Sequence, residues 1–438
     1  MTRSRNASPE QRNSLRRPVE ECFRREAGPS IPIPGDDADL IESGIFDSMA
    51  WVSFLRTVES ASGAGDLGSS LNDRSATLAA VFSALQDAGS SASEGSSHLP
   101  RQTRHGISSP AIITGSSSAL ASRLIPSEEV DRAFGMPLGK LRSRAGIESL
   151  AYAADGENEV TLGTRAAQEA MNAASCGAPQ LDWIIATSET HHDYPSLSAQ
   201  LHSRLLLRED CAALDVGGAC LGLLNALAVA QSLIASGRAR TVAVVTADVH
   251  SRTLTPDRVD GEFGGLFGDG ASAFLLRRAS DDIGDAYRLG DFIFGCAGQY
   301  AATIQVGARK EGGLNVKFDG EALSRAAITR MEKVLAAVEL RSGIALASVG
   351  AFATHQPNPR LVTLLAKQCG VSPGKFPPIA QTSGNLGSST CGAALHQALQ
   401  IAAKLPPAAH QPIFLASLGP GLLFGGGWLT PRNGSGRA

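Results

Sequence analysis

The sequence lacks the features that mark exported, membrane-spanning and nucleic-acid-binding proteins. No continuous apolar stretch of about 18 residues occurs, and no apolar run follows the polar N-terminus MTRSRNASPEQRNSLRR. The 39 basic and 42 acidic residues nearly cancel, so the chain has no excess of positive charge with which to bind nucleic acid. We therefore expect a cytoplasmic protein with neither a membrane nor a nucleic-acid partner.

Paired cysteines are also missing. The seven cysteines are scattered without CxxC spacing, and an odd number of them in a large domain argues for reduced thiols. Their positions are Cys22, Cys176, Cys211, Cys220, Cys296, Cys369 and Cys391. Because zinc ligands usually come in closely spaced pairs, we expect no metal site.

The composition of the chain changes sharply near residue 90. The segment GSSASEGSSHLPRQTRHGISSP is rich in Ser and Gly and has almost nothing to bury, which is typical of a flexible tether. Before it, PVEECFRREA, MAWVSFLRTVES and ATLAAVFSALQDA carry apolar residues at helical spacing. This pattern predicts an all-helical domain at residues 1–88, a linker at 89–108 and a larger domain after it.

The larger domain has an α/β pattern and contains a repeat. Strand-like runs such as WIIATS and TVAVVTADV alternate with Ala-rich helical stretches. A segment beginning at Cys220 aligns without gaps on one beginning at Cys391, and Val242 faces Ile413 in the strand that follows each helix. Two Ala-rich helices also match by composition alone, but the shared strand offset favours duplication. We expect two halves, at residues 109–285 and 286–438, with both Cys-headed helices buried at the centre.

Cys220 is the candidate nucleophile. It follows the strand-like CAALDVGGA and opens a long apolar helix, where unpaired N–H groups and the helix dipole favour a thiolate. Gly217 and Gly218 permit a tight turn, and the Cys220 N–H is a candidate oxyanion donor. A buried, inert cysteine is the alternative, which the position and the flanking glycines disfavour.

Two polar segments interrupt apolar sequence farther along the chain. ATHQPNPRLV carries His355 after a strand-like run, and QTSGNLGSSTCGAAL carries Asn385 before the second Cys-headed helix. Each has an ordinary structural interpretation, as a core histidine and as a turn asparagine. With Cys220, however, they form a nucleophile and two hydrogen-bonding groups suited to a thioester carbonyl. Glu189, at another strand end, is a further candidate acid or base, although we favour a solvated loop carboxylate.

Residues 109–432 resemble the β-ketoacyl-acyl carrier protein synthase III family of thiolase-fold condensing enzymes. The matching pieces are DVGGACLGLLNAL, LFGDGASAFLL, THQPNPRLV, SGNLGSST and SLGPGLLFGG, in the family's order and at its spacing. The resemblance implies a thiolase fold, with a duplicated five-layered αβαβα core, and a homodimer. It also implies a catalytic set of Cys220, His355 and Asn385, with a thioester forming on Cys220.

The resemblance further implies how substrates are held. Arg144, in an RTGI-like motif, and Arg360 correspond to contacts with the donor or a carrier protein, and Asn358 to a pantetheine contact. Lys140 stands where a tryptophan often stacks on the adenine of coenzyme A, which argues against CoA recognition. Pro420 stands where many members have a residue with an N–H, so we leave the second oxyanion donor unassigned.

The helical domain has its own resemblance. DLIESGIFDSMAWVSFLRTVES is similar to the modification site of acyl carrier proteins, which implies covalent 4′-phosphopantetheine on Ser48, attached by a phosphopantetheinyl transferase. Asp47 and Ser48 also lie where a helix N-cap is expected, and capping alone explains the pair. Acidic residues outnumber the single basic Arg56 between Asp36 and Ser60, as in carrier proteins that bind basic partner surfaces.

Together these features predict a carrier-fused β-ketoacyl synthase III-like enzyme of specialised lipid or polyketide biosynthesis. It would be acylated on Cys220 and would condense the acyl group with a malonyl-type thioester by decarboxylation, using acyl carrier proteins as partners. One alternative is an acyltransferase that makes an ester or an amide. Another is a non-catalytic thiolase-like scaffold, which the presence of Cys220, His355 and Asn385 disfavours. The sequence leaves open which substrate the fused carrier holds.

Overall fold

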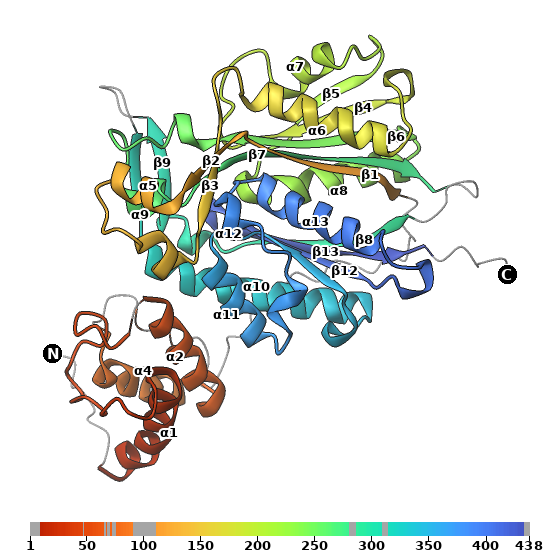
Figure 1. Ribbon diagram of the computed structural model, residues 1–438. Coiled ribbons are helices and arrows are strands. Elements are labelled where there is room, and N and C mark those ends of the chain that lie inside the picture. Colours follow the sequence, from red (N-terminus) through yellow and green to blue (C-terminus); the bar gives the residue numbers. More distant parts are fainter. Residues whose placement is uncertain are drawn as a thin grey trace. The chain divides into compact units, whose positions relative to one another are not determined.

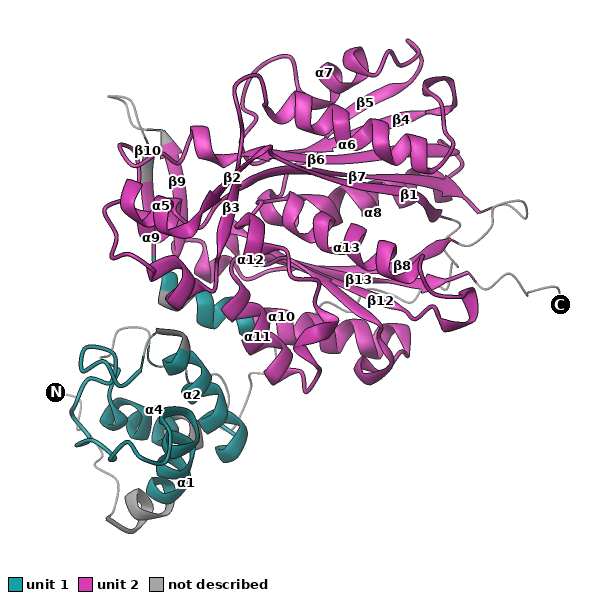
Figure 2. Cartoon of the chain, in the orientation of Figure 1, with its two compact units in different colours: residues 1–98, 319–328 teal, residues 99–318, 329–438 magenta. Residues whose placement is uncertain are grey.

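The chain divides into two compact units (Figure 2). One contains residues 1–98 and 319–328, and the other contains residues 99–318 and 329–438. The computed structural model describes residues 9–46, 48–64, 67, 71, 76–90, 111–279, 286–308 and 314–432. The predicted linker lies almost wholly outside the described residues, so its flexibility stays a prediction. Within the described part, no helix is both long and apolar enough to cross a membrane.

Helices make up the regular structure described in the N-terminal part of the first unit. They are α1 (Pro9–Ala27), α2 (Ser48–Ser62) and α4 (Leu78–Ser90), and the three segments predicted as helical lie on them. Four aromatic side chains, Phe23, Phe46, Trp51 and Phe54, are at most 2% exposed, and their neighbouring rings lie 5.4–6.5 Å apart. This cluster gives the unit an apolar core of its own.

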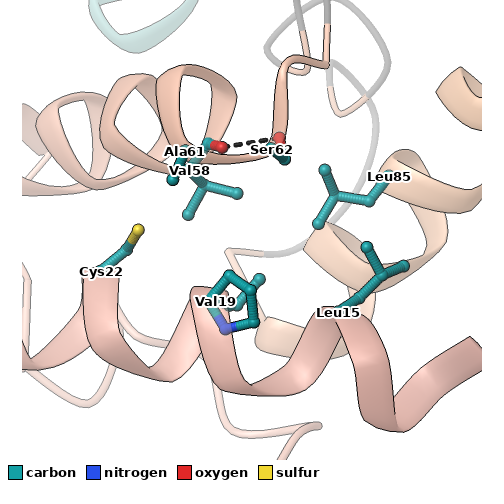
Figure 3. Close-up of a pocket in the computed structure, with 8 residues that line it drawn as sticks. Leu15, Val19, Cys22, Val58, Ala61, Ser62 and Leu85 are labelled. Atoms are coloured by element: carbon teal, nitrogen blue, oxygen red, sulfur yellow. Dashed lines mark hydrogen bonds between the residues drawn. The ribbon is translucent and has the colours of Figure 1, made fainter.

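A small cavity lies between these three helices (Figure 3). Its volume is about 70 Å³, and it is lined by Leu15, Pro18, Val19, Cys22, Val58, Ala61, Ser62 and Leu85. The Ser62 hydroxyl donates to the Val58 carbonyl at 2.7 Å, so it is satisfied within its own helix. Because a cavity of about 150 Å³ is needed to hold benzene, this one has room for only a few carbon atoms.

The second unit is built on a mixed nine-stranded sheet, in the order β11-β12-β13-β8-β1-β7-β6-β4-β5. The strands are β1 (Ala111–Leu120), β4 (Trp183–Thr187), β5 (Ala212–Asp215), β6 (Thr241–Val249), β7 (Asp269–Arg278), β8 (Tyr287–Cys296), β11 (Ala351–Thr354), β12 (Ile413–Gly419) and β13 (Leu423–Pro431). Small two-stranded sheets are formed by β2 (Arg123–Pro126) with β3 (Ser149–Tyr152), and by β9 (Ile304–Ala308) with β10 (Leu314–Phe318).

The pairing of the strands repeats from one half of this unit to the other. In the first half β6 is parallel to β4 and antiparallel to β7, which pairs with β1. In the second half β12 is parallel to β11 and antiparallel to β13, which pairs with β8. The halves meet along β1 and β8, where Ile112 pairs with Arg288 and Ile113 pairs with Tyr287. The predicted match of Val242 with Ile413 thus falls on the equivalent strands β6 and β12.

Helices cover and separate the two halves of the nine-stranded sheet in alternating layers (Figure 1). The helices α6 (Glu159–Ala173) and α7 (Leu197–Arg204) lie on one outer face, and α8 (Gly222–Ala235) and α13 (Ser389–Ala402) lie between the two halves of the sheet. On the other outer face lie α11 (Pro359–Gln368) and the part of α10 (Gly320–Ser342) that belongs to this unit. Short helices are α5 (Ser127–Ala133), α9 (Gly261–Gly264) and α12 (Ala380–Ser383). This is the predicted thiolase-like α/β layering, with both Cys-headed helices in the middle layer.

Candidate functional site

The turn that carries Cys220 is tightly constrained. After β5 the chain passes through Gly218 at φ +134° and Ala219 at φ +47°, a left-handed conformation that is strained for a residue with a side chain. Cys220 lies in the short 3₁₀ turn that leads into α8. Its carbonyl accepts a hydrogen bond of 2.6 Å from the Ser417 hydroxyl of β12, and Asn225 Nδ2 donates to the Gly217 carbonyl at 2.9 Å. Both halves therefore hold the backbone at Cys220 in place.

The Cys220 thiol is protonated at rest, which corrects the expectation of a thiolate. The residue is 9% exposed, and burial raises the pKa of its thiol well above the ordinary value. The carboxylate of Glu189 lies against the thiol and raises this pKa further, and the charge of Asp248 adds to the effect. Backbone N–H groups at the helix start act in the opposite direction but are outweighed, because burial and two nearby carboxylates disfavour a second negative charge.

Glu189 is not the solvated loop carboxylate that the sequence favoured. It follows β4 by two residues, its side chain is only 14% exposed, and its Oε2 lies 3.6 Å from Nε2 of His250. Burial alone would raise the pKa of Glu189, but His250 and Cys220 outweigh burial and lower it. The carboxylate is therefore ionised at neutral pH beside Cys220. The sequence carried a signal for this position, since Glu189 is the first ionisable residue after an apolar strand.

Sequence reasoning missed Asp248, near the end of β6, and His250, which directly follows that strand. Asp248 is fully buried, and burial together with the charge of Glu189 raises its pKa to about 6. Burial opposes a charge on His250, but Glu189 and Asp248 outweigh burial and raise the pKa of the imidazole to about 9. The ring nitrogen Nδ1 of His250 bonds the Gly268 carbonyl at 3.2 Å, which turns Nε2 toward Glu189. Polar residues that close an otherwise apolar run, TVAVVTADVH, were the available signal.

His355 follows β11 directly and is a neutral imidazole. It is 6% exposed, and its backbone N–H donates to the Ala416 carbonyl at 2.9 Å. Burial lowers the pKa of His355 to about 4, against an opposing influence from Glu189. Within the described part of the chain its Nδ1 has no hydrogen-bond partner, although the atom is buried. A buried imidazole of this kind is suited to bonding a carbonyl group that enters the site.

Asn385 presents its amide nitrogen rather than its oxygen. Its Oδ1 accepts hydrogen bonds from Gly387 N at 3.0 Å and from the Thr390 hydroxyl at 3.1 Å. Because a backbone N–H can only donate, the atom that bonds it must be the side-chain oxygen. The residue is 4% exposed, and its backbone pairs with Phe267 in an isolated parallel bridge. The N–H₂ group is thus the part of Asn385 left to bond a substrate.

Gly387 shows how closely these elements converge. A Cβ atom at this position would lie 2.5 Å from Cε1 of His250, 3.0 Å from Oδ2 of Asp248 and 3.1 Å from Cδ of Glu189. The glycine therefore lets the loop that carries Asn385 approach the ends of β4 and β6. Since the charge of Glu189 acts on both Cys220 and His355, the three predicted catalytic residues lie around one cluster.

The predicted contact residues lie at the start of α11 and around the short helical turn at residues 141–145. Asn358 caps α11 by accepting from Leu361 N at 3.0 Å, so its amide nitrogen remains as a donor. Arg360 donates to the Arg144 carbonyl at 3.2 Å, which brings the two predicted arginines together. Lys140 pairs with Glu262. Their roles toward a donor or a carrier protein stay predictions.

The loop after β12 borders the nucleophile but gives no clear second oxyanion donor. A Cβ at Gly419 would lie 2.6 Å from the Gly218 carbonyl, so the loop packs directly on the Cys220 turn. Pro420 follows and has no N–H to donate. A separate cavity of about 230 Å³, lined by residues of β2, α5 and the 251–256 segment, does not include Cys220. Within the described residues no His, Cys, Asp or Glu cluster is arranged to hold a metal ion.

Ser48 lies in the first unit and is the first residue of α2, while Asp47 lies outside the described residues. Part of the acidic bias around it is used internally. Asp36 pairs with Arg16 at 3.0 Å, and Glu59 pairs with Arg56 at 2.7 Å. Asp39 accepts backbone hydrogen bonds from three residues, Ile41, Glu42 and Ala76. The net acidic surface is therefore smaller than the residue count indicated.

Comparison with known proteins agrees with this geometry. The family model for 3-oxoacyl-[acyl-carrier-protein] synthase III matches residues 214–298, and the model for its C-terminal part matches residues 340–430. The β-ketoacyl-[acyl-carrier-protein] synthase III of Roseobacter denitrificans is 30% identical over 290 residues, covering 65% of this chain and 88% of that protein. A Streptomyces coelicolor synthase III is 30% identical over 331 residues, covering 73% and 96%.

Solved structures show the same fold. The 3-oxoacyl-(acyl carrier protein) synthase III of Pseudomonas aeruginosa superposes with a TM-score of 0.65 at 25% identity, covering 73% of this chain and 97% of that one. OleA from Xanthomonas campestris, with a TM-score of 0.66 at 21% identity and coverage of 73% and 98%, shares the fold. The chain belongs to the 3-oxoacyl-[acyl-carrier-protein] synthase III family of thiolase-fold condensing enzymes.

Proposed function

We propose that this protein is a carrier-fused condensing enzyme that loads an acyl group on Cys220 and extends it with a malonyl-type thioester. The observation that carries the proposal is the convergence of Cys220, His355 and Asn385 on one buried cluster from both halves of the fold. A thiol nucleophile beside two neutral hydrogen-bonding side chains suits thioester chemistry.

In the loading step the Cys220 sulfur attacks the carbonyl carbon of an acyl thioester. The constrained turn fixes the backbone that carries the sulfur, and we propose the Cys220 N–H as a donor to the developing oxyanion. The leaving thiol departs and the acyl group remains on Cys220. Lysine at position 140, paired with Glu262, favours a carrier-bound donor over coenzyme A.

In the condensing step His355 and Asn385 hold the carbonyl oxygen of the malonyl-type thioester. A neutral His355 and the N–H₂ group of Asn385 both stabilise negative charge that develops on that oxygen. Loss of carbon dioxide then leaves an enolate, whose carbon attacks the acyl carbonyl on Cys220. The bond between the acyl carbon and sulfur then breaks, Cys220 leaves as a thiolate that takes a proton from water to return to its resting thiol, and the product is a β-ketoacyl thioester.

The N-terminal helical domain is proposed to be the carrier. Ser48, as the first residue of α2, stands where the modified serine of a carrier protein begins a helix. A 4′-phosphopantetheine group there would supply a thiol that holds the acyl, malonyl or product group as a thioester. A tether of about twenty residues raises the local concentration of such a group to roughly the millimolar range. A dedicated substrate of specialised lipid or polyketide biosynthesis, a homodimer and a cytoplasmic location complete the proposal.

One observation favours a second function, an acyltransferase that makes an ester or an amide. Glu189 is ionised next to Cys220, and its negative charge disfavours the carboxylate of a malonyl group. The same carboxylate would accept a proton from an alcohol or amine acceptor. The two functions differ in product, because only decarboxylative condensation releases carbon dioxide and forms a carbon–carbon bond.

The deciding experiment incubates the full chain with an acyl thioester and a malonyl-carrier protein and analyses both protein and products by mass spectrometry. A β-ketoacyl product with release of carbon dioxide supports condensation. Unchanged malonyl groups, together with an ester or amide when an alcohol or amine is added, support the second function. A chain that never gains acyl mass contradicts both and leaves the scaffold interpretation.

Ser48→Ala tests the carrier. The unsubstituted chain should gain the mass of one phosphopantetheine group on treatment with a phosphopantetheinyl transferase and coenzyme A, and Ser48→Ala should gain none. Ser53→Ala, on the same helix, serves as the matched control and should be modified as the unsubstituted chain is. Modification that persists in Ser48→Ala would show that the attachment site lies elsewhere.

A further inference from the structure

A buried charged pair beside Cys220 has no role in the mechanism proposed above for Cys220, His355 and Asn385. Glu189 and His250 have side chains that are 14% and 5% exposed, and their charged atoms Oε2 and Nε2 lie 3.6 Å apart. Taking two charges out of water costs several kcal/mol per ion unless geometry and further hydrogen bonds compensate. Yet within the described part of the chain the buried Oε1 of Glu189 has no hydrogen-bond partner. The pair is thus a poor stabilising device for the fold.

The surrounding structure nevertheless fixes the pair firmly. Oδ1 of Asp248 accepts from Glu189 N at 2.5 Å and from the Ser188 hydroxyl at 3.1 Å, which anchors the backbone that carries the carboxylate. Oδ2 of Asp248 accepts from Ser388 N at 2.9 Å and its hydroxyl at 2.6 Å. Positioning the backbone through strong bonds while an oxygen of Glu189 stays unsatisfied is the arrangement expected of a group that acts on a substrate.

We propose that Glu189 is a further catalytic residue, which takes the proton of the Cys220 thiol as the sulfur bonds to the acyl carbon and then gives it to the departing sulfur. His250 is its positioning residue. This inference rests on the proposed acylation of Cys220 and adds to it the group that moves the proton.

The atoms balance without any other reactant. The Cys220 sulfur forms a bond to the acyl carbon, its S–H bond breaks, and the proton goes to the Glu189 carboxylate. The carbon–sulfur bond of the donor thioester then breaks with its electron pair on the departing sulfur. That sulfur takes the proton from the Glu189 carboxylic acid and leaves as a thiol, so Glu189 returns to its starting state.

The electrostatics of the site make such a partner necessary. Burial and the neighbouring carboxylates hold the thiol protonated, so a free thiolate is scarce at neutral pH. As the sulfur bonds to carbon, its proton becomes strongly acidic and transfers to a carboxylate already in contact. His250 keeps that carboxylate ionised and therefore able to accept. The other titratable groups that face Glu189 are Asp248, His355 and Cys220.

The experiment compares Glu189→Gln with Glu157→Gln in the full chain. Glu157 is a matched control, because its side chain is 16% exposed and bonds to Ser122 and Ala154, and the structure places it in no catalytic role. The first measurement is single-turnover loading of Cys220 from octanoyl-N-acetylcysteamine, by intact-protein mass. The second is alkylation of Cys220 by iodoacetamide across pH, resolved by peptide mass spectrometry with the exposed Cys296 as the internal reference.

The two measurements should move in opposite directions for Glu189→Gln. Loading should fall by about 10²-fold or more, as expected when a general base is lost. Alkylation should begin at lower pH than in the unsubstituted chain, because removing a neighbouring negative charge lowers the pKa of the thiol. Glu157→Gln should change neither, and Glu189→Asp should recover part of the loading rate.

His250→Gln provides a second variant. Without the imidazolium the pKa of Glu189 should rise, so the acid limb of the loading rate should move to higher pH while the rate on its plateau stays above that of Glu189→Gln. An acid limb that does not move would remove His250 from the mechanism.

Three outcomes would overturn the role of Glu189. Loading within twofold of the unsubstituted chain shows that no proton passes through it. A rise in both loading and alkylation shows that Glu189 merely suppresses the thiolate. A parallel fall in both, without recovery in Glu189→Asp, shows a deformed site. Since loading is measured without a malonyl acceptor, a chain that loads through Glu189 yet forms no β-ketoacyl product contradicts the proposed condensation alone.

Discussion

The two halves of the thiolase-like unit contribute different chemistry at equivalent places. Cys220 lies at the head of α8 beside carboxylates, whereas Cys391 lies in the equivalent α13, is fully buried, and donates to the Ala353 carbonyl at 3.3 Å. Burial alone raises the pKa of Cys391 to about 12. A duplicated scaffold therefore supplies two cysteines, and Cys220, which has charged neighbours and a strained turn, is the one that we propose reacts.

The same division holds for the other site residues. The first half provides the titratable groups Glu189, Asp248 and His250, and the second half provides the neutral donors His355 and Asn385. In the proposed mechanism, proton transfer thus belongs to one half and stabilisation of a carbonyl oxygen to the other.

The largest expected effect separates the two cysteines. Cys220→Ala should lower acyl loading by more than about 10³-fold, because the nucleophile is lost, while Ser48 stays modifiable. Cys391→Ala should keep loading and lose about 1 kcal/mol of the free energy of unfolding, because a small buried side chain is trimmed. Intact-protein mass and urea unfolding measure the two quantities. Equal loading by Cys220→Ala and the unsubstituted chain would remove Cys220 from the mechanism.

The next largest effect is expected at Asn385, one of the two neutral donors in the second half. Asn385→Asp keeps an oxygen for Gly387 and Thr390 but loses the N–H₂ donor, so decarboxylative condensation should fall by about 10²-fold and more than acyl loading does. Asn385→Ala should show the same order of effects with an added loss of stability. Rapid-quench measurement of both steps decides the matter, since equal losses in loading and condensation contradict the assigned role.

The smallest effect is on how the free energy of unfolding depends on pH, and it involves one histidine from each half. At His250 the neighbouring carboxylates outweigh burial and raise the pKa to about 9, above the ordinary 6.5. The contribution of His250 to the free energy of unfolding is therefore present below pH 6.5 and is lost as the pH rises toward 9. At His355 burial lowers the pKa to about 4. The contribution of His355 to the free energy of unfolding is therefore present above pH 6.5 and is lost as the pH falls toward 4.

Unfolding of the second unit, followed by circular dichroism from pH 4 to pH 9, separates the two contributions. His250→Gln should flatten the loss of the free energy of unfolding on the alkaline side, and His355→Gln should flatten it on the acid side. A variant that shifts the whole curve without changing its slope would show that the histidine does not titrate as described.

Much of the site could be predicted because it follows local rules. Cys220, His355 and Asn385 each sit where an apolar segment meets a turn, and the repeat headed by Cys220 and Cys391 located the central helices before any contact was known. The matching strands β6 and β12 have the same neighbours, parallel on one side and antiparallel on the other.

The remainder depends on tertiary structure that local rules do not carry. Glu189 and His250 are 61 positions apart and meet only because β4 and β6 are parallel neighbours. The ionisation of Cys220 was predicted from the helix start alone, yet burial and two carboxylates outweigh that influence. Likewise, the acidic residues Asp36 and Glu59 looked exposed in the sequence but are paired with arginines.

The hydroxyl of Ser417 matters for chimeric proteins in which the two halves come from different family members. This hydroxyl, from the second half, donates a hydrogen bond to the carbonyl oxygen of Cys220 in the first half, so residues of both halves hold the backbone at Cys220. A chimera that took its second half from another family member would lose this bond unless the residue at the position of Ser417 also carried a hydroxyl. Exchange of halves therefore has to preserve this bond together with the other contacts that join them, such as those between Asp248 and Ser388.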